Sequence, residues 1–325
     1  MKSIVAPLFA ALLAVLVPAA ESAQAQNYPT RPIKVIVPFA PGGGVDSIAR
    51  IVGQEMGKSL GQPVIVEHRP GAAGTIGAAA AAKSDPDGYT LVIIPGGHPL
   101  YGATYKSLPF DVLKSFDFVS TATTVPFVIV VHDDSKIRTL ADLIAEAKTK
   151  PDGLTFGNTG AGSMHQFTIE LIANRTGAKL ISIPFQGEVA ATTALLGGQI
   201  DFLLVTPTQI LSQIEGGKVR PLAVTGNTRF SKLPNVPTVE EAIALKGFDV
   251  RTWFGLAGPA GIPKDVIGRL NVEMRKALDL PEVRQKLEAI GGEISPSNSQ
   301  EFRDRVAREA QMWKEIVESS GFQKL

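Results

Sequence analysis

Two glycine-rich segments have the residue types and spacing to bind an anion. The first, PFAPGGGVDSIAR at Pro38–Arg50, places Gly42–Gly44 between an apolar strand expected at 33–38 and an amphipathic helix expected at 45–60. Glycines allow positive φ and let backbone N–H groups come close to a ligand. Because free amides and the positive end of the helix dipole meet there, this segment favours a carboxylate or a phosphate.

The second segment repeats this arrangement in the second half of the chain. A strand expected at 154–157 leads into GNTGAGSMH, Gly157–His165, and then into a helix. The hydroxyl groups of Thr159 and Ser163 add further donors. A single glycine loop is explained equally well as a tight turn. Two such loops, separated by an extended connection, predict instead two halves of one clamp that closes on a ligand.

Ser163 and His165 also raise the alternative of a Ser/His hydrolase. Nucleophilic catalysis needs a base within hydrogen-bond reach of the serine and a third group that orients the base. The sequence around Ser163 reads G-A-G-S-M-H rather than the G-x-S-x-G elbow. Residues two apart on a helix do not face one another. We therefore predict no catalytic residues and keep the hydrolase as an alternative.

Metal and nucleotide sites are not expected from the sequence. His68, His98, His132 and His165 are far apart and have no H-x-x-x-H spacing, and the chain has no cysteine. No glycine loop carries the lysine of a phosphate-binding P-loop, and the spacing in the segment 71–77 is not G-x-G-x-x-G. Close packing of small residues explains that segment better. We expect no metal and no cofactor.

Composition and the N-terminal residues indicate an exported protein. Residues 1–25 combine a basic start, an apolar stretch and an A-x-A cleavage site, which is typical of a secretory signal peptide. The 32 basic and 31 acidic residues are scattered, so nothing favours nucleic acid or an anionic membrane as a partner. Without cysteine there is neither a disulfide nor a lipid-anchored thiol. We expect a soluble periplasmic protein that is a monomer.

Strands alternate with helices in two stretches of the chain, which predicts two α/β domains with parallel sheets. Two long extended segments, 118–131 and 247–258, are expected to be crossover strands between them. The sequence thus predicts one lobe from 26–125 plus 250–325 and a second from 126–249. The helices near the C-terminus are expected to pack on the first lobe.

The chain resembles the substrate-binding proteins of tripartite tricarboxylate transporters, also called the Bug family. The resemblance covers the whole mature chain and is carried by eight segments in the order of the family: RPIKVIVPFAPGGGVDSIAR, VIVEHRPGAAGTIG, DGYTLV, FGNTGAGSMH, LLGGQID, VRPLAVTG, LPNVPTVEEA and WFGLAGPAGIP. It implies a two-lobed type II periplasmic binding protein fold. The two lobes would close on a carboxylate held by the two glycine segments and by ordered water.

The resemblance also implies a set of ligand-binding residues. They lie on the two glycine segments and on three further loops at 96–98, 186–188 and 206–208: Phe39, Gly42, Gly43, Gly44, Asp46, Gly97, His98, Thr159, Gly160, Ala161, Gly162, Ser163, His165, Gln186, Gly187 and Thr206. The chain has Phe185-Gln186-Gly187 where family members often have Tyr-Lys-Gly. The missing lysine removes a cation that could meet a second carboxylate.

The function expected from these features is that of a periplasmic receptor for a small carboxylate. The ligand would be a di- or tricarboxylate with an aliphatic or aromatic skeleton, and it would be delivered to the membrane permease subunits of a tripartite tricarboxylate transporter. Two alternatives remain at this point. One is the Ser/His hydrolase, and the other is a solute sensor that presents the closed form to a signalling protein.

Overall fold

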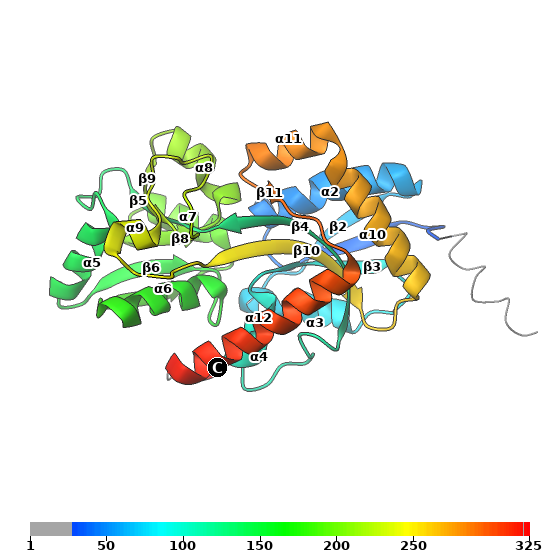
Figure 1. Cartoon of the computed structure of the whole chain (residues 1–325), viewed down its shortest axis with the longest axis horizontal. Coiled ribbons are helices and arrows are strands. Elements are labelled where there is room, and N and C mark those ends of the chain that lie inside the picture. Colours follow the sequence, from blue (N-terminus) through cyan, green and yellow to red (C-terminus); the bar gives the residue numbers. More distant parts are fainter. Residues whose placement is uncertain (1–27, 321) are drawn as a thin grey trace, which may run out of the picture.

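The computed structural model describes residues 28–320 and 322–325, so the predicted signal peptide at 1–25 lies outside the described residues. The chain forms two lobes that lie side by side, each built on one sheet with helices on its faces (Figure 1). Two long strands at the centre of the molecule, β4 and β10, lead from one lobe toward the other.

The sheet of the first lobe has six strands in the order β11-β4-β10-β3-β1-β2. Within it β1 pairs in parallel with β2 and β3, whereas β10 is antiparallel to β3 and β4, and β11 is antiparallel to β4. The bounds are β1 Ile33–Val37, β2 Val64–His68, β3 Thr90–Pro95, β4 Phe116–Pro126, β10 Arg251–Pro259 and β11 Glu293–Ile294.

The sheet of the second lobe has five strands in the order β7-β6-β8-β5-β9. Here β6 pairs in parallel with β7 and β8, and β5 is antiparallel to β8 and β9. The bounds are β5 Val128–His132, β6 Leu154–Asn158, β7 Leu180–Pro184, β8 Phe202–Val205 and β9 Val219–Val224.

The fold is the expected two-lobed α/β arrangement, but both sheets are mixed rather than parallel. The antiparallel members include β5, which enters the second lobe, and β10, which returns to the first. Strands such as β1 and β6 end at the space between the lobes. A strand that enters a lobe from the other one begins at that space, so it must run antiparallel to strands that end there. The alternation of strands and helices in the sequence did not reveal this direction.

Helices α2, α3, α4, α10 and α11 cover the first sheet. Their apolar faces meet the sheet in two clusters, one with α2 and α10 and one with the alanine-rich α3. Small side chains let α3 lie close to the sheet, and a Cβ on Gly77 would stand 2.7 Å from that of Pro38. The bounds are α2 Gly44–Leu60, η1 Ala72–Gly74, α3 Thr75–Ala82, α4 His98–Thr104, α10 Lys264–Asp279 and α11 Pro281–Ala289.

Helices α5 to α9 cover the second sheet. Two of them begin with capping boxes, Thr139 with Asp142 at α5 and Thr238 with Glu241 at α9. In each, a threonine hydroxyl accepts from a backbone N–H while the acidic residue accepts from the threonine N–H. The bounds are α5 Leu140–Thr149, α6 Met164–Thr176, α7 Glu188–Leu196, α8 Pro207–Glu215 and α9 Val239–Ile243.

The last helix, α12 (Ser299–Ser320), packs against both lobes and not only against the first (Figure 1). Phe302 lies 5.0 Å from Trp253 of the first lobe, measured between ring centroids. Further along the helix, Trp313 meets Phe167 of α6 edge to face at 5.8 Å. The sequence predicted helices near the C-terminus that pack on the first lobe, but not that the second lobe would share the apolar face of the last one.

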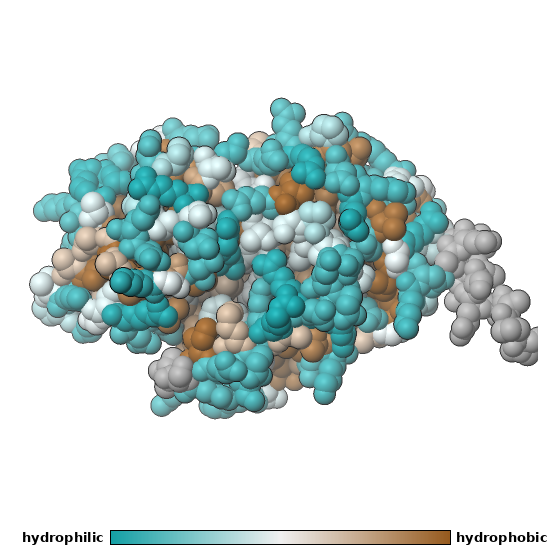
Figure 2. Space-filling model, viewed as in Figure 1, coloured by the Kyte–Doolittle hydropathy of each residue, from teal (hydrophilic) through white to brown (hydrophobic). Residues whose placement is uncertain are grey.

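The surface of the molecule is mostly hydrophilic on the side seen in Figure 2, with hydrophobic side chains in small separate groups. In the part of the chain that the structure describes, no helix is both long enough and apolar enough to span a bilayer.

Candidate functional site

A cavity lies between the two lobes, at the ends of the strands that point toward it. It encloses about 640 Å³, part of which is open to solvent, and both glycine segments contribute to its wall. From the first lobe come residues after β1 and β3, and from the second lobe residues after β6, β7 and β8. Ligands of open α/β sheets bind at this edge.

Four helices begin at this cavity, and each is at least nine residues long. The wall includes the first residue of three of these helices: Gly44 of α2, Met164 of α6 and Glu188 of α7. For the fourth helix, α8, the wall includes Thr206, which directly precedes it. The N–H groups in the first turn of a helix have no partner within the helix. The cavity therefore receives partial positive charge from both lobes, and no lysine or arginine of the described residues lines its wall.

The start of α2 is free of a side-chain cap. The residue that precedes the helix, Gly43, has an extended conformation and makes no side-chain hydrogen bond, because glycine has no side chain. By contrast, Ser163 caps α6, and its oxygen accepts the N–H of Gln166 at 3.3 Å. The first-turn amides of α2 are thus available to a ligand, and those of α6 are partly capped from within.

Asp46 holds the first glycine segment in shape but does not line the cavity. Its carboxylate accepts the N–H of Gly42 at 3.0 Å and lies 2.9 Å from both His68 and Arg50. Burial would raise the pKa of Asp46, but the hydrogen bonds from Gly42, Arg50 and His68 outweigh it and hold that pKa below its ordinary value. Gly42 has a φ of 86°, the left-handed region where glycine is favoured.

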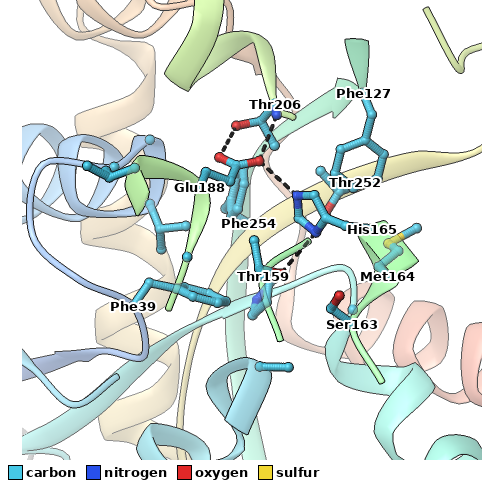
Figure 3. A pocket seen from close by; sticks show the side chains of 18 of the residues that line it. Phe39, Phe127, Thr159, Ser163, Met164, His165, Glu188, Thr206, Thr252 and Phe254 are labelled. Atoms are coloured by element: carbon cyan, nitrogen blue, oxygen red, sulfur yellow. Dashed lines mark hydrogen bonds and ion pairs between the residues drawn. The ribbon is translucent and has the colours of Figure 1, made fainter. Parts of the chain in front are cut away.

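A chain of hydrogen bonds crosses the second-lobe side of the cavity (Figure 3). The ring of His165 lies between Thr159, whose oxygen is 3.1 Å from Nδ1, and Glu188, whose carboxylate is 2.8 Å from Nε2. The same carboxylate accepts the backbone N–H and the hydroxyl of Thr206, both at 2.7 Å. Three loops that are distant in the sequence are thereby fixed to one another.

Several glycines mark places where the two lobes touch. A Cβ on Gly44 would stand 2.6 Å from Cβ of Thr208, and a Cβ on Gly160 would stand 2.8 Å from the backbone nitrogen of Ala73. Side chains at these positions would collide with the opposite lobe. The lobes therefore lie in a closed arrangement around the cavity.

The structure brings nine of the expected binding residues to the wall of the cavity. They come from both glycine segments and from the three further loops: Phe39, Gly43, Gly44, Gly97, Thr159, Ser163, His165, Gly187 and Thr206. Seven others lie outside the wall: Gly42, Asp46, His98, Gly160, Ala161, Gly162 and Gln186. Among these, Ala161 accepts a hydrogen bond from Tyr105 of the first lobe, and Gln186 is exposed.

His98 belongs to the core and not to the cavity. Its side chain is fully buried among aromatic rings, with the ring centroid 4.9 Å from that of Phe116 and 5.8 Å from that of Phe110. Nε2 lies 2.8 Å from the carbonyl oxygen of Val112. Burial lowers the pKa of His98 to about 4. The sequence placed this residue correctly at a strand end, but it could not reveal that the side chain turns away from the loop.

Sequence reasoning missed the apolar part of the wall. Phe254 lines the cavity, whereas its neighbour Trp253 is buried and donates to Glu309. From the sequence alone, a core position and a ligand contact explain either residue equally well. One further missed residue is acidic, Glu188 at the start of α7. The others are mostly apolar: Ala40, Val45, Ala73, Pro95, Tyr101, Phe127, Met164, Val189 and Thr252. The alternation of residues along β10 was the only signal that could have separated Phe254 from Trp253.

Ser163 and His165 do not form the pair that the hydrolase alternative requires. Ser163 caps α6, while both ring nitrogens of His165 are engaged by Thr159 and Glu188. Nor do three or more His, Asp or Glu side chains within 28–320 and 322–325 gather so that they could hold a metal ion.

Two α/β lobes that close on a cavity between them define the class of solute-binding proteins. Solved structures of that class match the whole fold. The periplasmic binding protein BugD superimposes with a TM-score of 0.88 at 31% identity, over 92% of this chain and all of BugD. MatC from Rhodopseudomonas palustris, solved with bound malate, gives 0.85 at 30% identity, over 89% of this chain and all of MatC. An R. palustris protein solved with adipate gives 0.87 at 28% identity, over 92% of this chain and all of that protein.

The family described as the tripartite tricarboxylate transporter family receptor matches residues 48–322. Among curated relatives, the protein BugT of Bordetella pertussis is 36% identical over 299 residues, which is 91% of each chain. The chain belongs to this receptor family, the Bug family, as the sequence segments indicated.

Proposed function

We propose that this protein captures a small carboxylate between its two lobes and delivers it to the membrane permease subunits of a tripartite tricarboxylate transporter. The observation that carries the proposal is the meeting of α2 from one lobe and α6 from the other at one cavity. Their first-turn amides would hold the carboxylate from both sides, so binding would need both lobes. Because Gly44 and Gly160 have no side chain, the lobes would come close enough for both helix starts to contact the same ligand.

Relatives support a carboxylate over other anions. The two R. palustris proteins were solved with adipate and with malate, and both match this chain over about nine tenths of its length. Among the residues that the structure describes, no lysine lines the cavity, and the wall is mostly apolar, which suits an organic acid better than a free phosphate. Residues Gly43, Gly44, Thr159, Ser163 and His165 would make the first contacts with that acid.

The transport role and the location are inferred from the family and from the N-terminal residues. Receptors named for tripartite transporters would pass their ligand to a permease, and the predicted signal peptide would place this one in the periplasm. The protein would act there as a monomer. Size-exclusion chromatography with light scattering would give the mass of one chain with and without ligand.

A thermal-shift panel of carboxylates tests the proposed function. The protein is unfolded, freed of ligand and refolded, and its unfolding midpoint is then measured with mono-, di- and tricarboxylates. A ligand at one hundred times its dissociation constant should stabilise the fold by about 2.7 kcal/mol, and so raise the midpoint. If no member of the panel raises it, the proposed function is wrong.

The chain of Thr159, His165 and Glu188 is the one observation that favours a second candidate, a hydrolase with threonine as the nucleophile. Its order of hydroxyl, imidazole and carboxylate is the order found in catalytic triads, although the ring nitrogens have exchanged roles. Assays with ester and amide substrates decide between the two. Turnover that disappears in Thr159→Val would support the hydrolase, whereas binding without turnover supports the receptor.

A further inference from the structure

We propose that the ligand of this protein carries a single carboxylate on an apolar body with the size and flatness of an aromatic ring. This inference rests on the proposed function and narrows it, because the sequence alone favoured a di- or tricarboxylate. It also separates this chain from the relatives that were solved with malate and adipate, both of which are dicarboxylates.

The charges around the cavity leave no partner for a second carboxylate. In the described part of the chain, no lysine or arginine lines its wall, and the acidic side chain there is Glu188. Arg50, the last residue of the first glycine segment, is held by Asp46 at 2.9 Å and does not line the wall. A buried carboxylate without a partner is costly, and one beside Glu188 would be repelled as well.

Glu188 is already committed to the protein. Oε1 accepts from the N–H of Thr206 and lies within hydrogen-bond distance of His165, while Oε2 accepts the hydroxyl of Thr206. These bonds tie the negative charge to the starts of α7 and α8 and to the imidazole. The starts of α2 and α6, one from each lobe, line the same cavity and remain for a ligand. One carboxylate suffices to accept hydrogen bonds from both.

The hydroxyl groups on the rest of the wall are largely occupied. Thr206 donates to Glu188, and Tyr101 donates to the carbonyl oxygen of Ala73. Thr252 lines the wall with a hydroxyl that makes no hydrogen bond in the described residues. That single hydroxyl suits a neutral polar substituent on the ligand and does not replace the several donors that a second carboxylate needs.

The remaining wall is apolar and partly aromatic. It is formed from both lobes by Phe39, Tyr101, Phe127, Met164, Val189 and Phe254. Phe39 and Phe254 come from the first lobe and Phe127 from the junction of β4 and β5, so the rings surround the ligand space from more than one side (Figure 3). Aromatic walls favour a flat apolar body, which gains from offset-stacked or edge-to-face contact.

Calorimetric titration with two matched pairs of acids tests this inference. Benzoate is compared with terephthalate, and hexanoate with adipate, since each pair differs mainly by one carboxylate. We expect each monocarboxylate to bind about a hundredfold more tightly than its dicarboxylate partner, and benzoate more tightly than hexanoate.

Equal or tighter binding of the dicarboxylates would overturn the inference and leave the proposed function standing. If none of the four acids binds while another carboxylate of the thermal-shift panel does, the inference is also wrong. Failure of the whole panel is instead failure of the proposed function.

A variant of Glu188 tests the electrostatic part. In Glu188→Gln the shape is kept and the charge is lost, so the preference for benzoate over terephthalate should fall about tenfold. The matched control is Glu215→Gln, which removes an exposed carboxylate at the end of α8 and should leave the preference unchanged. If Glu188→Gln weakens both acids by the same factor, the charge of Glu188 does not discriminate between them and this part is wrong.

Discussion

Gly44 at the start of α2 lies directly against Thr208 of α8, although the two residues belong to different lobes. A Cβ on Gly44 would overlap the hydroxyl oxygen of Thr208 and stand 2.6 Å from its Cβ. The third glycine of the first segment is thus a contact position as well as a source of a free amide. The closed form depends on the absence of a side chain there.

Substitution Gly44→Ala should therefore weaken ligand binding without destabilising the first lobe. Alanine is the better helix former, whereas its methyl group meets Thr208 only when the lobes are closed. An overpacking cost of about 1–3 kcal/mol would raise the dissociation constant about five- to 150-fold. The control is Gly268→Ala within α10, where nothing lies within 4 Å of the added Cβ. Equal binding by both variants would show that the contact does not limit closure.

Asp46 should act as a positioning residue for the first glycine segment. Asp46→Asn keeps the shape but loses the charge that holds Arg50 and His68, so binding should weaken about tenfold. Because the pKa of Asp46 is held below its ordinary 3.8, its contribution is present above that pH and is lost only in strong acid. The same loss is therefore expected at pH 8 and pH 9, both above the range in which histidine side chains generally change charge. Asp85→Asn, an exposed site, is the control, and a loss that changed between those pH values would contradict this account.

His98 should make the fold sensitive to acid. Its pKa is lowered from 6.5 to about 4 in the folded state, so below pH 6.5 the unfolded chain binds a proton that the folded protein does not. The free energy of unfolding should fall by about 3 kcal/mol between pH 6.5 and 4 through this residue. In denaturant titrations, His98→Phe should flatten the dependence of the free energy of unfolding on pH, although it also loses the bond to Val112. The control variant His132→Gln should keep the pH dependence of the wild type. An unchanged slope in His98→Phe would refute the assignment.

Ser163 should contribute to the fold and the ligand site but not to turnover. Ser163→Ala removes the cap of α6 and should lower the free energy of unfolding by about 1 kcal/mol. It should also weaken carboxylate binding, because the hydroxyl lines the cavity. Denaturant titration and calorimetry measure the two effects. Ester hydrolysis that is present in the wild type and abolished in this variant would restore the Ser/His alternative.

Much of the fold could be predicted from local patterns, and the cavity only in part. Apolar strands, glycine stops and the capping boxes at Thr139 and Thr238 depend on nearby residues, which the sequence displays directly. The direction of β5 and β10 depends on where the chain enters a lobe, and the position of Trp313 against Phe167 depends on how the lobes meet. Neither is a local property.

The distinction between local and non-local properties also explains which binding residues could be predicted from the sequence. Gly43, Gly44 and Thr159 could be predicted because a helix start after a glycine loop has a physical meaning of its own. His98 shows the limit, since a strand end fixes where its backbone lies but not which way the ring turns. Phe127 and Phe254 look like any core residues in the sequence, yet they line the cavity.

The central claim is that the two lobes close on a carboxylate, and small-angle X-ray scattering tests it most directly. Ligand-free refolded protein is measured with and without a saturating carboxylate chosen from the thermal-shift panel, alongside Gly44→Ala. The account predicts that the radius of gyration falls on ligand addition in the wild type, and that the same fall in Gly44→Ala requires a correspondingly higher ligand concentration. A carboxylate that binds with full occupancy and leaves the wild-type radius of gyration unchanged would contradict it.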